Sequence, residues 1–312
     1  TFNGTHNVVD SAKVEAGVFT FTGKTELPEV AYLSKDKEQP FVRFFLENAK
    51  IAITGNLYNP NEVYPTGTEA NEAMNTFNEL TYDTGEAYGV TELEARGQKF
   101  LNEKGKVADL YDIMKDYGIN GVRLRVWVDP TDGFCSPEDV LKMALRAKEH
   151  GLPVMVDFHY SDWWADPGKQ NIPERWKGMS AEEMKGALRE HTAATLQMLR
   201  RNGVDVPWVQ VGNETTHGML WDIARAETQM PTYAALTQAG YEAVKSVYPD
   251  AQVIVHLDNG WDADLYNRIF DGLKRNGAKW DAIGMSLYPF WSIQAGQIKD
   301  EQELIDRARA NI

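Results

Sequence analysis

The pattern of hydrophobic and polar positions changes along the chain. In the first part, short apolar stretches alternate with polar residues and are separated by turn formers, as at 16–23, 41–45 and 51–53. This alternation is typical of β-strands. We therefore expect residues 1–80 to form a small, mainly β domain with a short helix at 70–80 and a structural or interaction role.

Beyond residue 100, segments with helical spacing alternate with short apolar strands. Ser136 followed by Pro137 is a helix start, and Ser180 followed by Glu183 has the spacing of a capping box. The pattern predicts strands at 122–128, 154–159, 209–214, 253–257 and 283–288, and helices at 107–117, from 136, from 180, at 233–247, at 264–276 and from 301 to the end.

Repeated strand–helix units predict a parallel sheet covered by helices. Both a (β/α)8 barrel and an open doubly wound sheet fit this order. The sequence contains no Gly-x-Gly-x-x-Gly after a strand, which disfavours a dinucleotide-binding fold.

The five predicted strands share a second pattern. In each, one set of alternate residues is aliphatic and the other carries polar or charged residues toward the carboxyl end. Barrel enzymes keep their chemistry at that end of the strands. We therefore expect an active site formed by the polar set, which includes Arg125, Asp157, His159, Glu214, His256 and Tyr288.

The residue types at these positions suggest acid–base chemistry on a sugar. Glu214, next to Asn213, could act as a general acid if desolvation raises its pKa. Arg125 could position a carboxylate. The other polar residues could donate hydrogen bonds to substrate hydroxyls or to a catalytic carboxylate, namely His159, His256 and Tyr288.

Aromatic residues are abundant, with nine Trp and thirteen Tyr. They fit either a large aromatic core or platforms that stack on sugar rings. Trp127, Trp163, Trp164 and Trp291 lie at or just after strand ends, where they could bind sugars or anchor loops.

Composition narrows the class of partner. Lys and Arg total 32 against 46 Asp and Glu, a net charge of -14, which argues against nucleic acid or an anionic membrane. No apolar run approaches the ~18 residues of a membrane span. Cys135 is the single cysteine, and His159, His217 and His256 lack metal-ligand spacing, so we expect no disulfide framework, no metal and no cofactor. We expect a monomer.

Four longer motifs carry a family resemblance: residues 122–127, 157–170, 211–214 with 218–221, and 287–291. Together they resemble glycoside hydrolase family 53, the endo-β-1,4-galactanases of arabinogalactan breakdown. The resemblance implies a (β/α)8 barrel over 81–312, retaining hydrolysis of β-1,4-galactan and Glu214 as acid/base. As substrate-binding residues we take Arg125, Trp127, Asp157, His159, Trp164, Asn213, His256, Tyr288 and Trp291.

The chain departs from the family pattern at two places. The family's nucleophile is a Glu at the end of strand 7, whereas this sequence stops at Ile312 in what reads as helix 6. We therefore expect a fragment of low activity that lacks the last two strands, with the nucleophile beyond residue 312. Glu301 and Glu303 read as a solvated helix face. The family's first-strand Gly-x-Asp-x-Ser is replaced at 84–89.

Two other functions remain open: a related barrel glycosidase acting on another β-linked polysaccharide such as a mannan, and a non-catalytic glycan-binding protein. Residues 1–80 weakly resemble an N-terminal β domain of bacterial envelope proteins, on residues 10–14, 17–24 and 44–48. Because polymers are cut outside the cytoplasm, we expect a secreted or cell-envelope location. The chain begins with Thr1, so we expect a processed or missing N-terminus.

Overall fold

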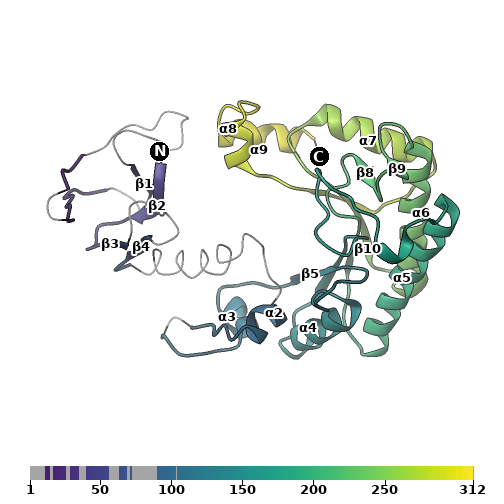
Figure 1. The fold of residues 1–312 in the computed structure, drawn as a ribbon, viewed down its shortest axis with the longest axis horizontal. Helices are drawn as coiled ribbons and strands as arrows, with labels where there is room; N and C mark the ends of the chain where they lie inside the picture. Colours follow the sequence, from purple (N-terminus) through teal and green to yellow (C-terminus); the bar gives the residue numbers. More distant parts are fainter. Residues whose placement is uncertain are drawn as a thin grey trace. The chain divides into compact units, whose positions relative to one another are not determined.

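The computed structural model of the 312-residue chain describes residues 11–14, 17–25, 29–34, 40–55, 63–68, 71, 90–102 and 104–311. It contains two compact units, Thr1–Tyr88 and Gly89–Ile312. In Figure 1 the first unit runs from purple to blue and the second from blue through teal to yellow.

The first unit contains two antiparallel strand pairs. β1 (Glu29–Ser34) pairs with β2 (Pro40–Leu46), and β3 (Ala52–Gly55) pairs with β4 (Val63–Thr66). The strands predicted at 41–45 and 51–53 correspond to β2 and β3, whereas β1 and β4 were missed. The mainly β character of this part is confirmed.

One strand predicted in the first unit was wrong. Within the predicted segment 16–23, the described residues from Gly17 onward contain no strand longer than a single bridged residue. Val18 and Phe21 are exposed, so the apolar side chains of this segment bury too little surface to hold a strand in place. Apart from Asn71, the helix predicted at 70–80 lies outside the described residues.

The second unit alternates helices with parallel strands. Its elements are α2 (Val90–Ala95), α3 (Leu110–Asp116), β5 (Val122–Val126), α4 (Pro137–Glu149), β6 (Val154–Phe158), α5 (Ala181–Arg201), β7 (Trp208–Val211), β8 (Gly218–Met219), β9 (Ala224–Arg225), α6 (Met230–Val247), β10 (Gln252–Leu257), α7 (Ala263–Arg275), β11 (Ala282–Met285), α8 (Pro289–Gln294) and α9 (Glu301–Ala310).

The strand order decides between the two folds that the sequence left open. The five-stranded sheet runs β5-β6-β7-β10-β11, and every neighbouring pair is parallel. A doubly wound sheet reverses its strand order at a switch point, whereas a barrel wall adds each strand beside the preceding one. Since β8 and β9 form only a separate hairpin, this order is that of a (β/α)8 barrel wall.

Local sequence signals set the helix starts. The Ser136 side chain accepts a hydrogen bond from Asp139 N at 3.2 Å, and Ser180 and Glu183 form the reciprocal capping box, both as predicted. Another helix starts later than its apolar pattern suggested. The Asp109 side chain accepts from the backbone N–H of Tyr111, so α3 begins at Leu110 and not at residue 107.

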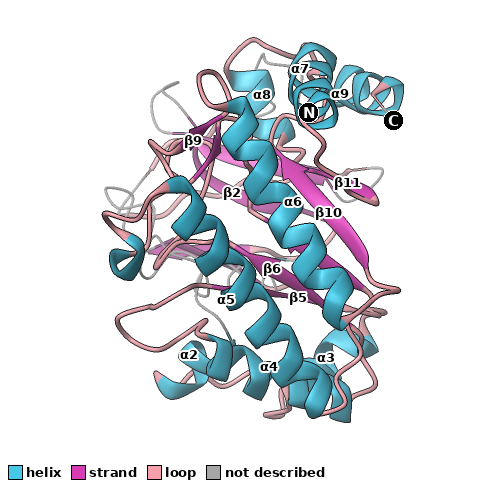
Figure 2. Ribbon diagram, turned by 90° about the vertical axis from the view of Figure 1, so that its right-hand side faces the viewer, coloured by secondary structure: helices cyan, strands magenta, loops and turns pink. Residues whose placement is uncertain are grey.

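The core lies between the sheet and its outer helices. Figure 2 shows α4, α5 and α6 lying across one face of the sheet. The aliphatic strand residues on that face are buried, as predicted, but the pattern fails at β11, where Ile283 is 42% exposed. β11 has β10 as its single strand neighbour in the described sheet, so its outer side lacks cover. The buried strand residues are Val122, Leu124, Val126, Val154, Val156, Phe158, Val209, Val211, Val253, Val255 and Leu257.

Two helix glycines offer a matched test of this packing. A Cβ at Gly240 in α6 would lie 2.5 Å from Val211 Cγ1, whereas a Cβ at Gly186 in α5 would meet nothing within 4 Å. We expect Gly240→Ala to lower the free energy of unfolding by about 1–3 kcal/mol through overpacking. Gly186→Ala should raise it by up to about 1 kcal/mol through helix propensity. Urea unfolding measures both, and equal effects would contradict the packing of α6 on β7.

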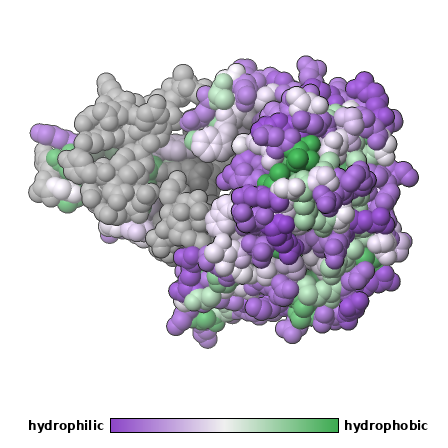
Figure 3. Space-filling view, turned by 45° about the vertical axis from the view of Figure 1, so that its right-hand side comes forward, coloured by the Kyte–Doolittle hydropathy of each residue, from purple (hydrophilic) through white to green (hydrophobic). Residues whose placement is uncertain are grey.

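The described surface gives two further observations. Figure 3 shows mainly hydrophilic residues on the visible face of the second unit, with apolar residues scattered among them. Within the described ranges, no helix has both the length and the apolar character needed to cross a membrane.

Candidate active site at the carboxyl ends of the strands

The turn after β7 presents the two residues singled out by the sequence. β7 ends at Val211, so Asn213 and Glu214 follow the strand and do not form its last residues. Gly212 has a φ of 85°, and a Cβ there would lie 2.6 Å from Thr215 Cγ2. Glu214 itself has a φ of 47°, a conformation that residues with side chains rarely adopt. Such backbone strain is typical of functional sites.

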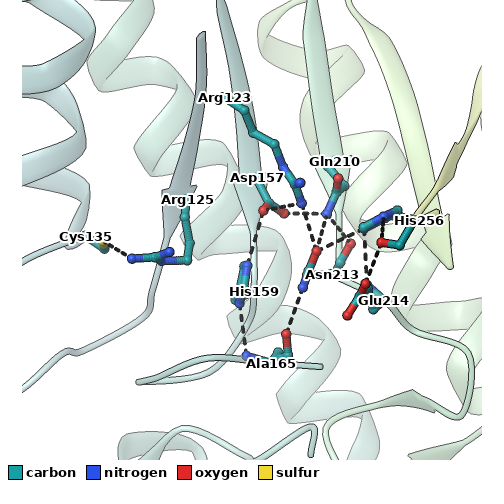
Figure 4. Close-up of polar contacts among 12 residues, drawn as sticks. Arg123, Arg125, Cys135, Asp157, His159, Ala165, Gln210, Asn213, Glu214 and His256 are labelled. Carbon is teal, nitrogen blue, oxygen red and sulfur yellow. Dashed lines mark hydrogen bonds and ion pairs between the residues drawn. The ribbon is translucent and has the colours of Figure 1, made fainter. Parts of the chain in front are cut away.

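Asn213 connects four parts of the site. Its Nδ2 donates to Ala165 O at 2.8 Å. Its Oδ1 accepts from Arg123 Nη2 at 2.8 Å and from Gln210 Nε2 at 3.1 Å, and lies 2.9 Å from His256 Nδ1. The amide is buried and all its bonds fix its orientation. Figure 4 shows these side chains converging from neighbouring strands.

Asp157, at the end of β6, is a buried carboxylate with three partners. Arg123 Nη2 lies 2.7 Å from Oδ2, Gln210 Nε2 donates to Oδ1 at 2.5 Å, and His159 Nε2 lies 3.2 Å from Oδ2. Burial alone would raise the pKa of Asp157, but the interactions with His159 and Arg123 outweigh it and lower that pKa. Asp157 is therefore ionised, and its carboxylate fixes the positions of Arg123, Gln210 and His159.

The tautomer of His159 follows from its two neighbours. The backbone N–H of Ala165 donates to Nδ1 at 3.0 Å, so the proton of the neutral ring lies on Nε2, toward Asp157. Burial lowers the pKa of His159. The ring thus links the strand end to the loop that follows β6.

Glu214 has the properties of a general acid. Burial is the largest influence and raises its pKa. The hydrogen bond with Ser286 and the charge of Arg123 lower this pKa, and the Asp258 and Asp166 carboxylates raise it, so that the pKa of Glu214 is raised overall. Its Oε1 lies 2.5 Å from Ser286 Oγ. A carboxyl group with a raised pKa holds its proton more readily and can donate it to a leaving oxygen.

Arg125 contacts two aromatic rings and a cysteine. Its guanidinium lies 3.7 Å from the centre of the Trp164 ring and 4.6 Å from that of Trp127, and its Nη2 donates to Cys135 Sγ at 3.2 Å. Figure 4 shows Arg125 turned toward Cys135. The sequence predicted that Arg125 positions a carboxylate, whereas in the structure the guanidinium of Arg123 contacts Asp157.

The aromatic residues lie in two layers. Trp127 is 2% exposed and packs against Trp163, with ring centroids 4.6 Å apart, so its ring is too buried to stack on a sugar as expected. Trp163 is 39% exposed and Trp164 is half-buried. Trp127 therefore supports the outer two rings, and these are the surfaces that a sugar could contact.

Tyr288 and Trp291 follow β11. They are 58% and 65% exposed, and Trp291 packs edge-on against Phe290 at 4.9 Å. They lie outside the hydrogen-bonded network around Asn213, and their open rings leave them free to meet a substrate.

Three residues of the network were missed by the sequence analysis. Arg123 was on the polar face of its strand but was passed over for Arg125. Gln210 was on the same face as Glu214, so the alternation contained its signal. Ser286 also lay on the polar face of its predicted strand, but serine is too common there to stand out.

The three histidines weighed as metal ligands have other partners. His159 and His256 belong to the network, and His217 Nδ1 lies 2.6 Å from Glu227 Oε1. No group of three His, Cys, Asp or Glu residues suited to a metal ion occurs in the part of the chain that the structure describes.

The fold and these residues define a (β/α)8-barrel protein with an Asn–Glu acid site at the carboxyl ends of its strands. A family model described as "Glycosyl hydrolase family 53" matches residues 85–309, and the chain belongs to this family. A second model, "Domain of unknown function (DUF4369)", matches residues 1–74.

Individual relatives agree with this membership. The chain is 38% identical over 216 residues to "Uncharacterized protein in bgaB 5'region" of Niallia circulans, covering 67% of this chain and 59% of that protein. It is 37% identical over 210 residues to "Endo-beta-1,4-galactanase" of Bacillus subtilis (strain 168), covering 65% and 48%. This chain thus spans about half to three fifths of the length of these relatives.

Solved structures show the same likeness. The fold resembles one from a study of two fungal beta-1,4-galactanases, with a TM-score of 0.62 and 34% sequence identity. The match covers 65% of this chain and 62% of that one. The fold predicted from the resemblance, a (β/α)8 barrel preceded by a mainly β part, is confirmed.

Proposed function

We propose that this protein cleaves β-1,4-galactan internally, by a retaining mechanism in which Glu214 is the acid/base. The observation that carries the proposal is the half-buried Glu214, with its raised pKa, on the turn after β7 of a family 53 chain. Glu214 protonates the leaving oxygen in the first step and then activates the water that completes hydrolysis.

A retaining mechanism also needs a second carboxylate about 5–5.5 Å from the first. We assign no residue of 1–312 to that role. Arg123, which contacts Asp157 and Asn213, places a positive charge near Glu214, and such a charge favours ionisation of a second carboxylate.

Substrate binding is the second part of the proposal. The Arg125 guanidinium lies against the Trp164 ring, and this ring offers a surface on which a sugar could stack. Tyr288 and Trp291 extend the surface on the β11 side, whereas His159 and His256 are buried with both ring nitrogens engaged and help to hold the site in place. The buried residues Trp127, Asp157 and Asn213 act by holding these groups in place.

The proposed location of the protein follows from the size of its proposed substrate. A galactan polymer is too large to enter the cytoplasm, so we propose that the protein acts outside it, secreted or in the cell envelope, as a monomer. We further propose that residues 1–80 form a separate accessory domain and that 81–312 carry the chemistry.

Titration calorimetry with β-1,4-galactotetraose and mannotetraose tests the substrate class. We expect the galacto-oligosaccharide to bind and Trp164→Ala to weaken that binding about tenfold, through the lost stacking surface. Trp208→Ala is the matched control. Trp208 is 39% exposed at the amino end of β7, away from the site, and its loss should leave binding unchanged.

The other outcomes would overturn this assignment. Tighter binding of mannotetraose would move the substrate class to mannans. Equal loss of binding in the Trp164 and Trp208 variants would mean that the carboxyl ends of the strands are not where the sugar lies.

A further inference from the structure

Ser286 lies between the acid and a histidine. It follows β11, and its Oγ is 2.5 Å from Glu214 Oε1 and 2.9 Å from His256 Nε2. Its backbone is held on both sides: Ser286 N–H donates to Leu257 O, and Gly260 N–H donates to Ser286 O, each at 3.0 Å. A serine hydroxyl has one hydrogen, so it can donate to the carboxyl group or to the imidazole but not to both.

The orientation of Asn213 determines which nitrogen of His256 carries a proton. Arg123 Nη2 is a donor without acceptor capacity and lies 2.8 Å from Oδ1, which identifies that atom as the oxygen. His256 Nδ1 lies 2.9 Å from the same oxygen and must donate to it. The backbone N–H of Glu214 also points at Nδ1, but at the longer distance of 3.4 Å.

The polarity of the remaining bonds follows in sequence. With its proton on Nδ1, neutral His256 has a bare Nε2, and this nitrogen accepts the hydrogen of Ser286. The lone pairs of Ser286 Oγ then face Glu214, where they can only accept. A protonated Glu214 donates its hydrogen to Ser286 Oγ. An ionised Glu214 would instead place a lone pair of Oε1 against a lone pair of Ser286 Oγ, with the two atoms 2.5 Å apart.

We propose that Ser286 and His256 are positioning residues that hold the proton on Glu214 through a directed chain of hydrogen bonds, from Glu214 to Ser286, from Ser286 to His256 and from His256 to Asn213. The proposal deepens the proposed function, because it rests on Glu214 as the acid/base. Once Glu214 has given its proton to the leaving oxygen, the Ser286 hydroxyl must turn toward the carboxylate and leave His256 Nε2 without a donor. The network therefore favours the acid form of the enzyme.

The surrounding charges agree with this protonation. Burial and then the Arg123 guanidinium lower the pKa of His256 to about 4, while Asp157 acts in the opposite direction and His159 adds to the lowering. At neutral pH His256 is therefore uncharged, as the chain of bonds requires. Around Glu214, burial, Asp258 and Asp166 favour the protonated form, whereas Arg123 favours the ionised form, as would a Ser286 hydroxyl that donated to the carboxylate.

Nuclear magnetic resonance on the chain of residues 1–312 tests the chain of bonds without any need for turnover. In ¹⁵N-histidine-labelled protein at neutral pH, we expect His256 to show the tautomer with hydrogen on Nδ1. In protein with ¹³C-labelled glutamate carboxyls, we expect Ser286→Ala to lower the pKa of Glu214 by about one pH unit, because the acid form loses its acceptor. The Glu214 resonance is assigned by its absence in Glu214→Gln.

The opposite results would overturn the proposal. A Ser286 hydroxyl that simply donated to the carboxylate would make Ser286→Ala raise the pKa of Glu214, and a His256 tautomer with hydrogen on Nε2 would reverse the chain. Ser246→Ala removes a hydroxyl from the outer helix α6 and should change neither quantity. Absence of galactan cleavage by the complete gene product would count against the proposed function alone, since both readouts are independent of cleavage.

Discussion

Replacing Glu214 with Gln is expected to lower galactan cleavage about 10²–10⁴-fold, the usual contribution of a positioned general acid and base. Gln keeps the size and the hydrogen-bonding capacity of the side chain but cannot transfer the proton. Sugar binding should therefore change far less than turnover. Release of reducing ends from galactan measures cleavage by the complete gene product. For residues 1–312 with azide as an external nucleophile, mass spectrometry of the glycosyl azide measures cleavage, because this product carries no reducing end.

A surface change serves as the control for this substitution. Glu242, on the outer helix α6, accepts a hydrogen bond from Gln238 and is exposed. Glu242→Gln makes the same change of charge away from the site and should leave cleavage unchanged. If the wild-type protein binds galactan without cleaving it and Glu214→Gln binds equally well, the glycan-binding function replaces hydrolysis. If Glu214→Gln retains wild-type turnover, Glu214 is not the acid/base.

Hydrophobic periodicity was enough to predict a parallel sheet covered by helices, whereas the barrel was predicted from the family resemblance. Val154 and Val156 are buried because the outer helices cover one aliphatic face of the parallel sheet. Side chains of a strand alternate between its two faces, so this face appears in the sequence as aliphatic residues at alternate positions. The residues at which the strands end were harder to predict from the sequence. β7 stops at Val211 because Gly212 adopts a positive φ, and a glycine in an apolar stretch does not reveal its dihedral angles.

The site shows a different limit of sequence reasoning. Arg125 is the register partner of Asp157 across the β5–β6 pair, so choosing it as the partner of a carboxylate was reasonable. The ion pair is nevertheless made by Arg123. The guanidinium of Arg125 instead lies over the Trp164 ring, a contact between a strand and a distant loop that no local pattern encodes.

The hydrogen-bond directions within the network were also beyond the sequence. Each depends on which neighbour is a donor without acceptor capacity, as Arg123 is for Asn213. The alternation along the strands predicted that Asn213, Glu214 and His256 lie together, but the position of a proton among them requires the distances.

A loss of stability in mild acid is the second large effect that we expect. His191 is buried among the rings of Phe158, Tyr160 and Trp176, and its Nε2 has no hydrogen-bond partner among the described residues. Burial, followed by the charge of Arg175, lowers its pKa from 6.5 to about 4. His191 therefore binds a proton less readily in the folded chain than in the unfolded chain.

The sign of the pH dependence follows from that difference. Between pH 6.5 and about 4 the unfolded state binds more protons, so the stabilisation is complete above 6.5 and is lost as the pH falls through this window. The lowered pKa corresponds to about 3 kcal/mol. Burial lowers the pKa of His256 to about 4 as well, so a second loss of similar size occurs over the same window.

His191→Leu separates this effect from general acid sensitivity. The variant should keep its free energy of unfolding within about 1 kcal/mol at pH 7, because it removes a buried nitrogen without a partner. At pH 4 it should be more stable than the wild type by about 3 kcal/mol. Urea unfolding followed by tryptophan fluorescence measures the second unit alone, since all nine Trp lie in it. Leu196→Met, on the same buried face of α5, is the control and should change the free energy of unfolding equally at both pH values. If His191→Leu also changed it equally at both pH values, His191 would not be responsible for the acid-induced loss of stability.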